Sequence, residues 1–246
     1  MSSGDCVSLG NKTNLQMSHH TISCTGTACG TALNTNATST AGDIVGTGGI
    51  LGCWANTAPV LFSGTNPTIT DVNVDLAPLG SSCATPTNGL GQFRTITRAV
   101  VANATGFCID ASGAGDINDS IAHDCDIGIR VRRLSPNGTD VTGTLVIDNN
   151  VNIRNLASGT GPTLRDSTVR NPGTCNFANS GGSCAGAASV LTLSGTDFID
   201  NTIPVNGTQV VPRSPLELRV ARCRAATRLS SLHRLRCDRD RNAETW

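Results

Sequence analysis

The sequence contains no tyrosine, and aromatic residues make up only 3% of its 246 positions. A core built without large rings relies on valine, isoleucine, leucine and alanine, which suits a fold with a narrow interior. Basic residues are not interleaved with aromatic residues, so the stacking platforms that bind single-stranded nucleic acids are missing. The formal net charge is +0, which gives no electrostatic reason to expect a nucleic-acid or membrane partner.

Long apolar runs are absent as well. No stretch approaches the roughly 18 consecutive apolar residues of a membrane-spanning helix, and residues 1–3 lack the charged start and apolar run of a signal peptide. Neither standard glycine-rich phosphate loop occurs, and Asp116–Ser120 lacks the downstream glycine and glutamate of an EF-hand. The sequence therefore predicts no membrane span, no cofactor and no metal site.

A short phrase that recurs between residues 143 and 201 organises the chain. Its three copies are Leu145–Asn155, Leu164–Asn171 and Leu191–Asn201. Each copy starts with an aliphatic residue or run, passes a small polar turn, and ends on an apolar residue, a charged residue and an asparagine. Val151–Arg154 alternates apolar and polar residues, which is typical of a half-buried strand. The intervening Gly, Asn and Asp residues favour turns.

The repetition decides between fold classes. No gap between the strands holds a helical pattern of about 10–15 residues, so a βαβ fold is disfavoured. A sandwich, a barrel or a β-solenoid is left, and the repeated phrase favours the solenoid, in which equivalent positions of successive coils stack. Asn155, Asn171 and Asn201 are 16 and 30 residues apart, so the coils must differ in length. We expect these asparagines at coil corners, where their side-chain amides stack along the axis.

Other segments continue the alternation. Residues 5–24 predict a strand, a turn and a strand, residues 42–54 a further coil, and residues 93–110 a return to the coils after an excursion. Residues 67–76 alternate most cleanly. The predicted inward residues of two of these segments are Ile44, Ile50, Leu51, Trp54, Ile69, Val72, Val74 and Leu76.

The first coil matches a known pattern. The opening coil of many right-handed parallel β-helices, which usually has a glycine at the position of His19, is matched at Leu15, Met17, His20, Thr21 and Ile22. With its variable coil lengths, the chain resembles the right-handed parallel β-helix of the pectin-lyase-like superfamily. The resemblance implies an all-β fold shared with polygalacturonases, which use aspartates on the parallel sheet, and pectate lyases, which use calcium-binding aspartates and an arginine base. The chain lacks the sequence motifs that carry catalysis in both groups.

The cysteines point to an oxidising compartment. Eleven cysteines with no Cys-x-x-Cys pair are many for a cytosolic protein. Zinc is the competing interpretation, but neither the spacing nor nearby histidines support it. The expected disulfides are first Cys175–Cys184, then Cys6–Cys24 and Cys108–Cys125, and at least one of the nine cysteines before residue 213 is free or pairs elsewhere. We expect an extracellular or cell-surface protein whose signal peptide is not present in this chain.

The composition changes at about residue 212. Residues 1–212 hold fourteen aspartates against nine basic residues, a net charge of −5, whereas residues 213–246 hold nine arginines against four acids, a net charge of +5. Ser214–Glu217 is a capping box with proline at the first helical position. We therefore expect a parallel β-helix domain over 1–212 and an Arg-rich helical segment over 213–246. That segment has three interpretations: a cap on the solenoid, a basic partner-binding helix, or a coding artefact.

The densest cluster of ionisable groups runs from Asp116 to Arg133. In an extended segment Asp124 and Asp126 would project from the same face, with their Cα atoms about 7 Å apart. Paired carboxylates of this kind suit inverting glycoside hydrolysis, in which one is the acid and the other the base. Asp124, Asp126 and His123 are therefore the candidate catalytic residues.

A structural interpretation competes with this catalytic one. The acids would cap turns, while Ile127, Ile129 and Val131 fill the core. Arg130, Arg132 and Arg133 would pair with aspartates of neighbouring coils, or contact sulfated or uronic-acid glycans. Because no catalytic motif accompanies the repeats, we expect a non-catalytic extracellular or surface β-helix module that binds carbohydrate. The alternative is a polysaccharide-degrading enzyme, a glycoside hydrolase or lyase, acting on acidic glycans such as polygalacturonate.

Overall fold

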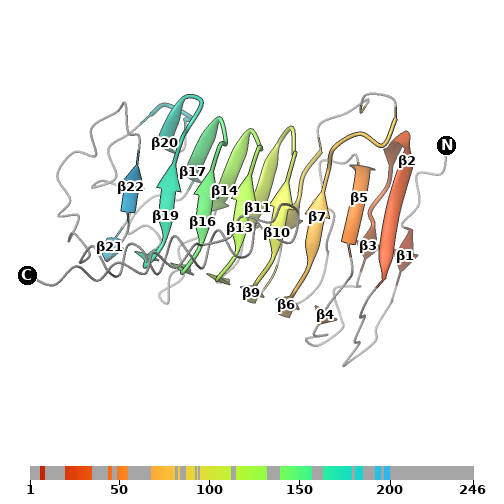
Figure 1. Ribbon diagram of the computed structural model, residues 1–246, viewed down its shortest axis with the longest axis horizontal. Coiled ribbons are helices and arrows are strands. Elements are labelled where there is room, and N and C mark those ends of the chain that lie inside the picture. The colour runs from red at the N-terminus through yellow and green to blue at the C-terminus, as the bar shows by residue number, and fades with distance from the viewer. Residues whose placement is uncertain are drawn as a thin grey trace, which may run out of the picture. The chain divides into compact units, whose positions relative to one another are not determined.

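The computed structural model is a parallel β-solenoid, which confirms the predicted all-β class. Successive strands of each sheet run parallel and lie side by side along the solenoid (Figure 1). The predicted helix after Ser214 lies outside the described residues, and the predicted domain boundary at residue 212 stays a prediction. The structure describes residues 6–8, 20–34, 44–45, 49–54, 68–80, 83, 87–91, 93, 95–111, 115–131, 139–156, 163–178, 181–184, 192–194 and 197–199.

Three parallel sheets form the walls of the solenoid. The eight-stranded sheet contains β2 (Thr21–Cys29), β5 (Gly49–Trp54), β7 (Asn73–Asp75), β10 (Val100–Ala102), β13 (Ile121–His123), β16 (Leu145–Ile147), β19 (Thr168–Arg170) and β22 (Asp197–Ile199). The seven-stranded sheet contains β4 (Ile44–Val45), β6 (Thr68–Thr70), β9 (Thr95–Thr97), β12 (Asp116–Asn118), β15 (Asp140–Thr142), β18 (Thr163–Arg165) and β21 (Thr192–Ser194). The five-stranded sheet contains β8 (Leu90–Gly91), β11 (Phe107–Ala111), β14 (Ile127–Val131), β17 (Val151–Asn155) and β20 (Cys175–Ala178). Apart from these, β1 (Val7–Ser8) pairs with β3 (Leu33–Asn34).

Each regular coil passes through the three sheets in the same order. The chain runs through the seven-stranded sheet, turns into the eight-stranded sheet and then into the five-stranded sheet, as in β12, β13 and β14. The first corner takes two residues and the second three or four. Because β9, β12, β15, β18 and β21 begin at residues 95, 116, 140, 163 and 192, the coils differ in length, as predicted.

Aliphatic side chains from the middle of the short strands fill the interior. Ile96, Ile117, Val141 and Leu164 stack in register and are at most 2% exposed. The side chain of Ile44 lies outside the described ones, and Leu51 is half-buried. The remaining predicted inward residues are buried, namely Ile50, Trp54, Ile69, Val72, Val74 and Leu76, together with Ile127, Ile129 and Val131.

Left-handed backbone turns the chain at both corners. The first corner begins with Asp71, Arg98, Asp119, Gly143 and Asp166 in successive coils, with φ between 49° and 59°. The second corner begins in the same way with Asn103, Asp124, Asp148 and Asn171. Asn and Asp tolerate this conformation better than other side chains because they hydrogen-bond locally. The Asp and Asn residues between strands therefore set the corners.

A ladder of buried hydroxyl groups supports the first corner. The backbone N–H of Ala99 donates to Ser120 Oγ (3.2 Å), that of Ser120 to Thr144 Oγ1 (3.4 Å), and that of Thr144 to Ser167 Oγ (3.1 Å). Each hydroxyl donates in turn to the carbonyl two residues before it, at 2.7–3.0 Å. The ladder therefore satisfies corner amides that would otherwise be buried without a partner.

A ladder of buried asparagines supports the second corner. Asn149 Oδ1 accepts from the N–H of Cys125 (2.9 Å), and its Nδ2 donates to the carbonyl of Ala122 (3.1 Å) and to Asn152 Oδ1 (3.0 Å). Asn152 Nδ2 then donates to Asn176 Oδ1 at 2.6 Å. All three asparagines are at most 5% exposed. Stacked side-chain amides therefore hold successive coils together.

The residues predicted to form this ladder do not form it. Asn155 ends β17 in the five-stranded sheet, whereas Asn171 opens the corner after β19. Ile153 pairs with Phe177, not with the corresponding residue of the next phrase. The two phrases therefore occupy different positions in their coils. Asn201 lies outside the described residues.

Gly128 leaves the space into which the asparagine ladder fits. A Cβ at this position would lie 2.6 Å from Asn149 Nδ2, 2.6 Å from the carbonyl oxygen of Asn152 and 2.7 Å from Val146 Cγ1. We expect Gly128→Ala to lower the free energy of unfolding by about 2 kcal/mol in urea denaturation, because the core would be overpacked. The control is Gly80→Ala, where a Cβ meets nothing within 4 Å. Equal effects of the two substitutions would refute the steric explanation.

The described residues form four disulfides: Cys24–Cys29, Cys53–Cys83, Cys108–Cys125 and Cys175–Cys184. The predicted Cys108–Cys125 and Cys175–Cys184 pairs are confirmed. The predicted Cys6–Cys24 pair is wrong, because the pairing of β2 with β5 shifts between Cys24 and Cys29 and brings these two sulfurs together. Cys6 is free and exposed. The disulfides indicate an oxidising environment.

Candidate functional site

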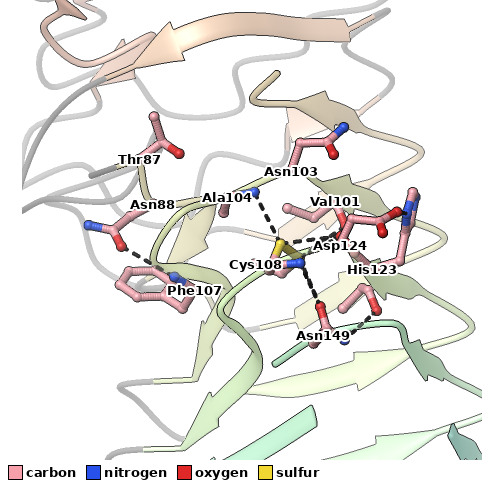
Figure 2. Close-up of a disulfide and its surroundings, with 12 residues drawn as sticks. Thr87, Asn88, Val101, Asn103, Ala104, Phe107, Cys108, His123, Asp124 and Asn149 are labelled. Atoms are coloured by element: carbon pink, nitrogen blue, oxygen red, sulfur yellow. Dashed lines mark hydrogen bonds and ion pairs between the residues drawn. A yellow bond between two sulfur atoms is a disulfide. The ribbon is translucent and has the colours of Figure 1, made fainter. Parts of the chain in front are cut away.

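The predicted catalytic residues gather at one corner of the solenoid. His123 ends β13, Asp124 opens the corner with φ of 54°, and Asp126 precedes β14. Figure 2 shows His123 and Asp124 side by side next to the Cys108–Cys125 disulfide. The segment is a turn, not the extended strand that the sequence-based geometry assumed. The left-handed residue breaks the alternation, so the expected same-face arrangement of the two carboxylates does not apply.

His123 and Asp124 are in direct contact. His123 Nδ1 lies 2.6 Å from Asp124 Oδ2, which orients the imidazole in the manner of a general base held by a carboxylate. The side chain of Asp124 is 53% exposed, whereas that of His123 is 16% exposed. His123 Nε2 is buried and has no hydrogen-bond partner among the described residues. The ring nitrogen that would exchange a proton with a substrate is therefore not accessible to one.

The second carboxylate is bonded to the next coil. Asp126 Oδ1 accepts from Asn150 Nδ2 at 2.9 Å, and Asn150 Oδ1 accepts from the hydroxyl of Thr174 one coil further on. Beside this chain, Asp148 Oδ1 accepts from Asn171 Nδ2 at 3.0 Å. The exposed carboxylates and amides of the corner thus form polar chains that run along the solenoid axis.

This arrangement favours binding over acid–base chemistry. Catalytic carboxylates work best in a site that excludes water, whereas Asp124 and Asp126 are exposed. Within the described ranges, no group of three or more His, Cys, Asp or Glu side chains is placed to hold a metal ion. The carboxylate and amide groups of the corner are suited to hydrogen bonds with a hydroxyl-rich ligand.

A second charged cluster lies on the outer face of the five-stranded sheet. Arg130 Nη2 donates to Asp110 Oδ2 at 2.8 Å, and the guanidinium carbon lies 3.8 Å from the centre of the Phe107 ring. The side chains of Asp110 and Arg130 are 6% and 16% exposed. Arg130 therefore pairs with an aspartate of the neighbouring coil, as the structural interpretation of the sequence expected. Arg132 and Arg133 lie outside the described residues. Arg154 follows Arg130 in register on β17.

The sequence carries a signal for this cluster, although no known motif marks it. In three successive coils an inward isoleucine is followed by one charged residue: Ile109-Asp110, Ile129-Arg130 and Ile153-Arg154. Aligning the coils on the inward isoleucine, instead of on the asparagines, places the three charges in one column.

A third charged pair is exposed. Arg98 Nε and Nη2 donate to the two carboxylate oxygens of Asp71 at 2.5 and 2.7 Å, and both side chains are more than 40% exposed. The hydrogen bond that Arg98 donates to Asp71 raises the pKa of Arg98 above its ordinary value. The negative charges of Asp71 and Asp119 also raise this pKa, whereas burial lowers it. Because water screens this pair, it contributes little to stability.

Comparisons of the chain with protein-family models, with curated proteins and with solved structures found no match. The described residues include no helix that is long and apolar enough to cross a membrane.

Proposed function

We propose that this solenoid is a non-catalytic module of an extracellular or cell-surface protein and that it binds polysaccharide. The observation that carries the proposal is the corner around Asp124 and Asp126, where exposed carboxylates and amides bond one another from coil to coil. The four disulfides support the extracellular setting. The short parallel strands and variable coils support a right-handed β-helix of the pectin-lyase-like type.

A polysaccharide suits this surface because both are periodic. Neighbouring strands of a sheet lie about 4.8 Å apart, so equivalent side chains recur along the solenoid at a spacing comparable to one sugar unit. The corner repeats in this way through Asp126, Asn150 and Thr174, which bond one another in successive coils. Each hydrogen bond contributes only about 1 kcal/mol, so useful affinity requires contacts from several coils at once.

We expect the purified chain to be retained on at least one insoluble polysaccharide. Oligosaccharides of increasing length should compete for binding, and their affinity should rise with length, because a longer chain contacts more coils. A pull-down over a panel of wall and matrix polysaccharides, followed by competition, measures both. If the chain bound none of the polysaccharides of the panel, the proposed function would be refuted. Full competition by a monosaccharide would refute it as well.

The alternative function is a polysaccharide-degrading enzyme acting on acidic glycans such as polygalacturonate. The contact between His123 Nδ1 and Asp124 Oδ2 favours it, because an oriented imidazole is a common general base. Under our proposal, the chain releases neither reducing ends nor unsaturated products from polygalacturonate or alginate. Turnover by the parent chain that is lost in Asp124→Asn and Asp126→Asn would establish the enzyme instead. His123→Gln is the third variant to compare.

A further inference from the structure

One column of charged side chains runs across the outer face of the five-stranded sheet. Asp110 pairs with Arg130 between β11 and β14, and Arg130 pairs with Arg154 between β14 and β17. The isoleucines that precede these three residues are at most 2% exposed and belong to the core. Because successive side chains of a strand point to opposite faces, the charged ones point outward. Arg130 and Arg154 therefore extend from neighbouring strands, whose backbones lie about 4.8 Å apart.

Arg130 is held on two sides. Its Nη2 is bonded to Asp110 and its guanidinium lies over the Phe107 ring. Its Nε is buried, so this N–H group is not available to a ligand. A fixed guanidinium loses less conformational entropy when it binds a ligand than a mobile one does. Arg130 is therefore a preorganised cation.

A disulfide-closed turn bounds the column beyond Arg154. A Cβ on Gly182 would lie 3.3 Å from Arg154 Nη2, so this turn contacts the guanidinium group. The Cys175–Cys184 disulfide and the antiparallel bridge between Ala178 and Cys184 fix the turn. The two arginines thus lie between the Asp110–Phe107 contacts on one side and the turn on the other.

The five-stranded sheet differs in charge from the rest of the domain. Residues 1–212 carry a net charge of −5. In the strands of this sheet and in the segments that lead from them to the next coil, the one acidic residue is Asp110. The basic residues of the same strands and segments are Arg94, Arg130, Arg132, Arg133 and Arg154. This surplus of arginines favours an anionic ligand at the five-stranded sheet.

Two neighbouring guanidinium groups select the type of anion. One guanidinium group satisfies both oxygens of a carboxylate, whereas a tetrahedral oxyanion offers three or four oxygens and accepts from two guanidinium groups at once. We propose that Arg130 and Arg154 bind the sulfate or phosphate ester group of a polysaccharide. This proposal rests on the polysaccharide-binding function proposed above and names the group that the solenoid recognises.

Dextran derivatives of equal length provide matched probes: dextran, dextran sulfate, dextran phosphate and carboxymethyl dextran. We expect the full chain to bind the sulfate or phosphate derivative more tightly than the carboxymethyl derivative in microscale thermophoresis at fixed salt. Arg154→Gln should weaken that binding about tenfold, because it removes a charged fork. Arg154→Lys keeps the charge without the fork and should weaken it by less.

Arg165→Gln is the control, since it removes the same charge from an exposed position on the seven-stranded sheet. It should change the affinity by less than about twofold. The nine arginines of residues 213–246 are the same in every variant, so their attraction for polyanions cancels. A loss that is confined to dextran sulfate or to dextran phosphate identifies the ester and supports the site.

Three results would overturn the site. They are an unchanged affinity in Arg154→Gln, equal losses in Arg154→Gln and Arg165→Gln, and a preference for carboxymethyl dextran. Thermal melts establish that each variant is folded, and if Arg154→Gln unfolds, Arg154→Lys carries the same comparison. Retention on the polysaccharide panel without these effects would refute this site alone. Binding to none of the polysaccharides would refute the proposed function itself.

Discussion

Replacing Asp110 with asparagine is expected to lower the free energy of unfolding by about 3 kcal/mol. The substitution removes the counter-charge of Arg130 from a pair whose side chains are 6% and 16% exposed. It also leaves two arginines in register, because Arg154 is the next residue of the column. A charge left without its partner in a poorly solvated position costs more than the intact pair contributes. Urea denaturation followed by circular dichroism measures the effect.

Asp71→Asn is the matched control, because it removes one carboxylate from the Arg98–Asp71 pair. This pair has two short contacts, at 2.5 and 2.7 Å, but its side chains are 45% and 47% exposed. Asparagine also tolerates the left-handed φ of 57° at this position. We expect a loss below about 1 kcal/mol. Equal losses in the two variants would show that burial does not decide the strength of these pairs.

Removing the Cys108–Cys125 disulfide is expected to have an effect of similar size. The bond joins β11 to the corner before β14, and the two cysteines are 17 positions apart in the sequence. Loop closure of this length contributes about 3 kcal/mol. The double substitution of both cysteines by alanine also opens space beside Asn149, which bonds to the N–H of Cys125 (Figure 2). Urea denaturation of this variant without reductant measures the loss.

Native-state reduction offers a control for the same bond. Cys108 and Cys125 are 0% and 5% exposed, whereas Cys184 is exposed. A dithiol reductant should therefore open Cys175–Cys184 in the folded protein while Cys108–Cys125 stays closed, since thiol–disulfide exchange needs access to a sulfur. Alkylation and mass spectrometry identify the free thiols. Equal rates of alkylation at both pairs would contradict the placement of Cys108–Cys125 in the core.

The sequence was sufficient to predict the class of fold, because the alternation of apolar and polar residues is a local signal. Residues 67–76 show this most clearly. Their predicted inward residues, Ile69, Val72, Val74 and Leu76, are all buried. Period two and short polar gaps follow directly from strands that turn after three residues.

The alignment of the coils could not be predicted from the same signal. Each coil contains several short strands that end in polar residues, so similar phrases arise at different corners. Asn155 ends a strand and Asn171 opens a corner, although the residues before them are alike. The buried ladder instead uses Asn149, Asn152 and Asn176, whose role depends on which strands pair. Register is a long-range property, and one shifted residue moves a side chain to the other face.

The geometry of the candidate site could not be predicted for a related reason. His123, Asp124 and Asp126 lie at one corner because they are neighbours in the sequence. Their geometry depended on the left-handed conformation of Asp124, which the sequence alone does not specify. Asp110 was missed because its partner, Arg130, lies one coil away.

The most direct test of the proposed function combines binding and turnover in one sample. The chain is incubated with a polysaccharide that retains it, and bound protein and soluble sugar products are measured over the same period. We predict stable retention without release of products, and the same result for Asp124→Asn and Asp126→Asn. Release of products by the parent chain, and its loss in these two variants, would contradict the proposal of a non-catalytic solenoid.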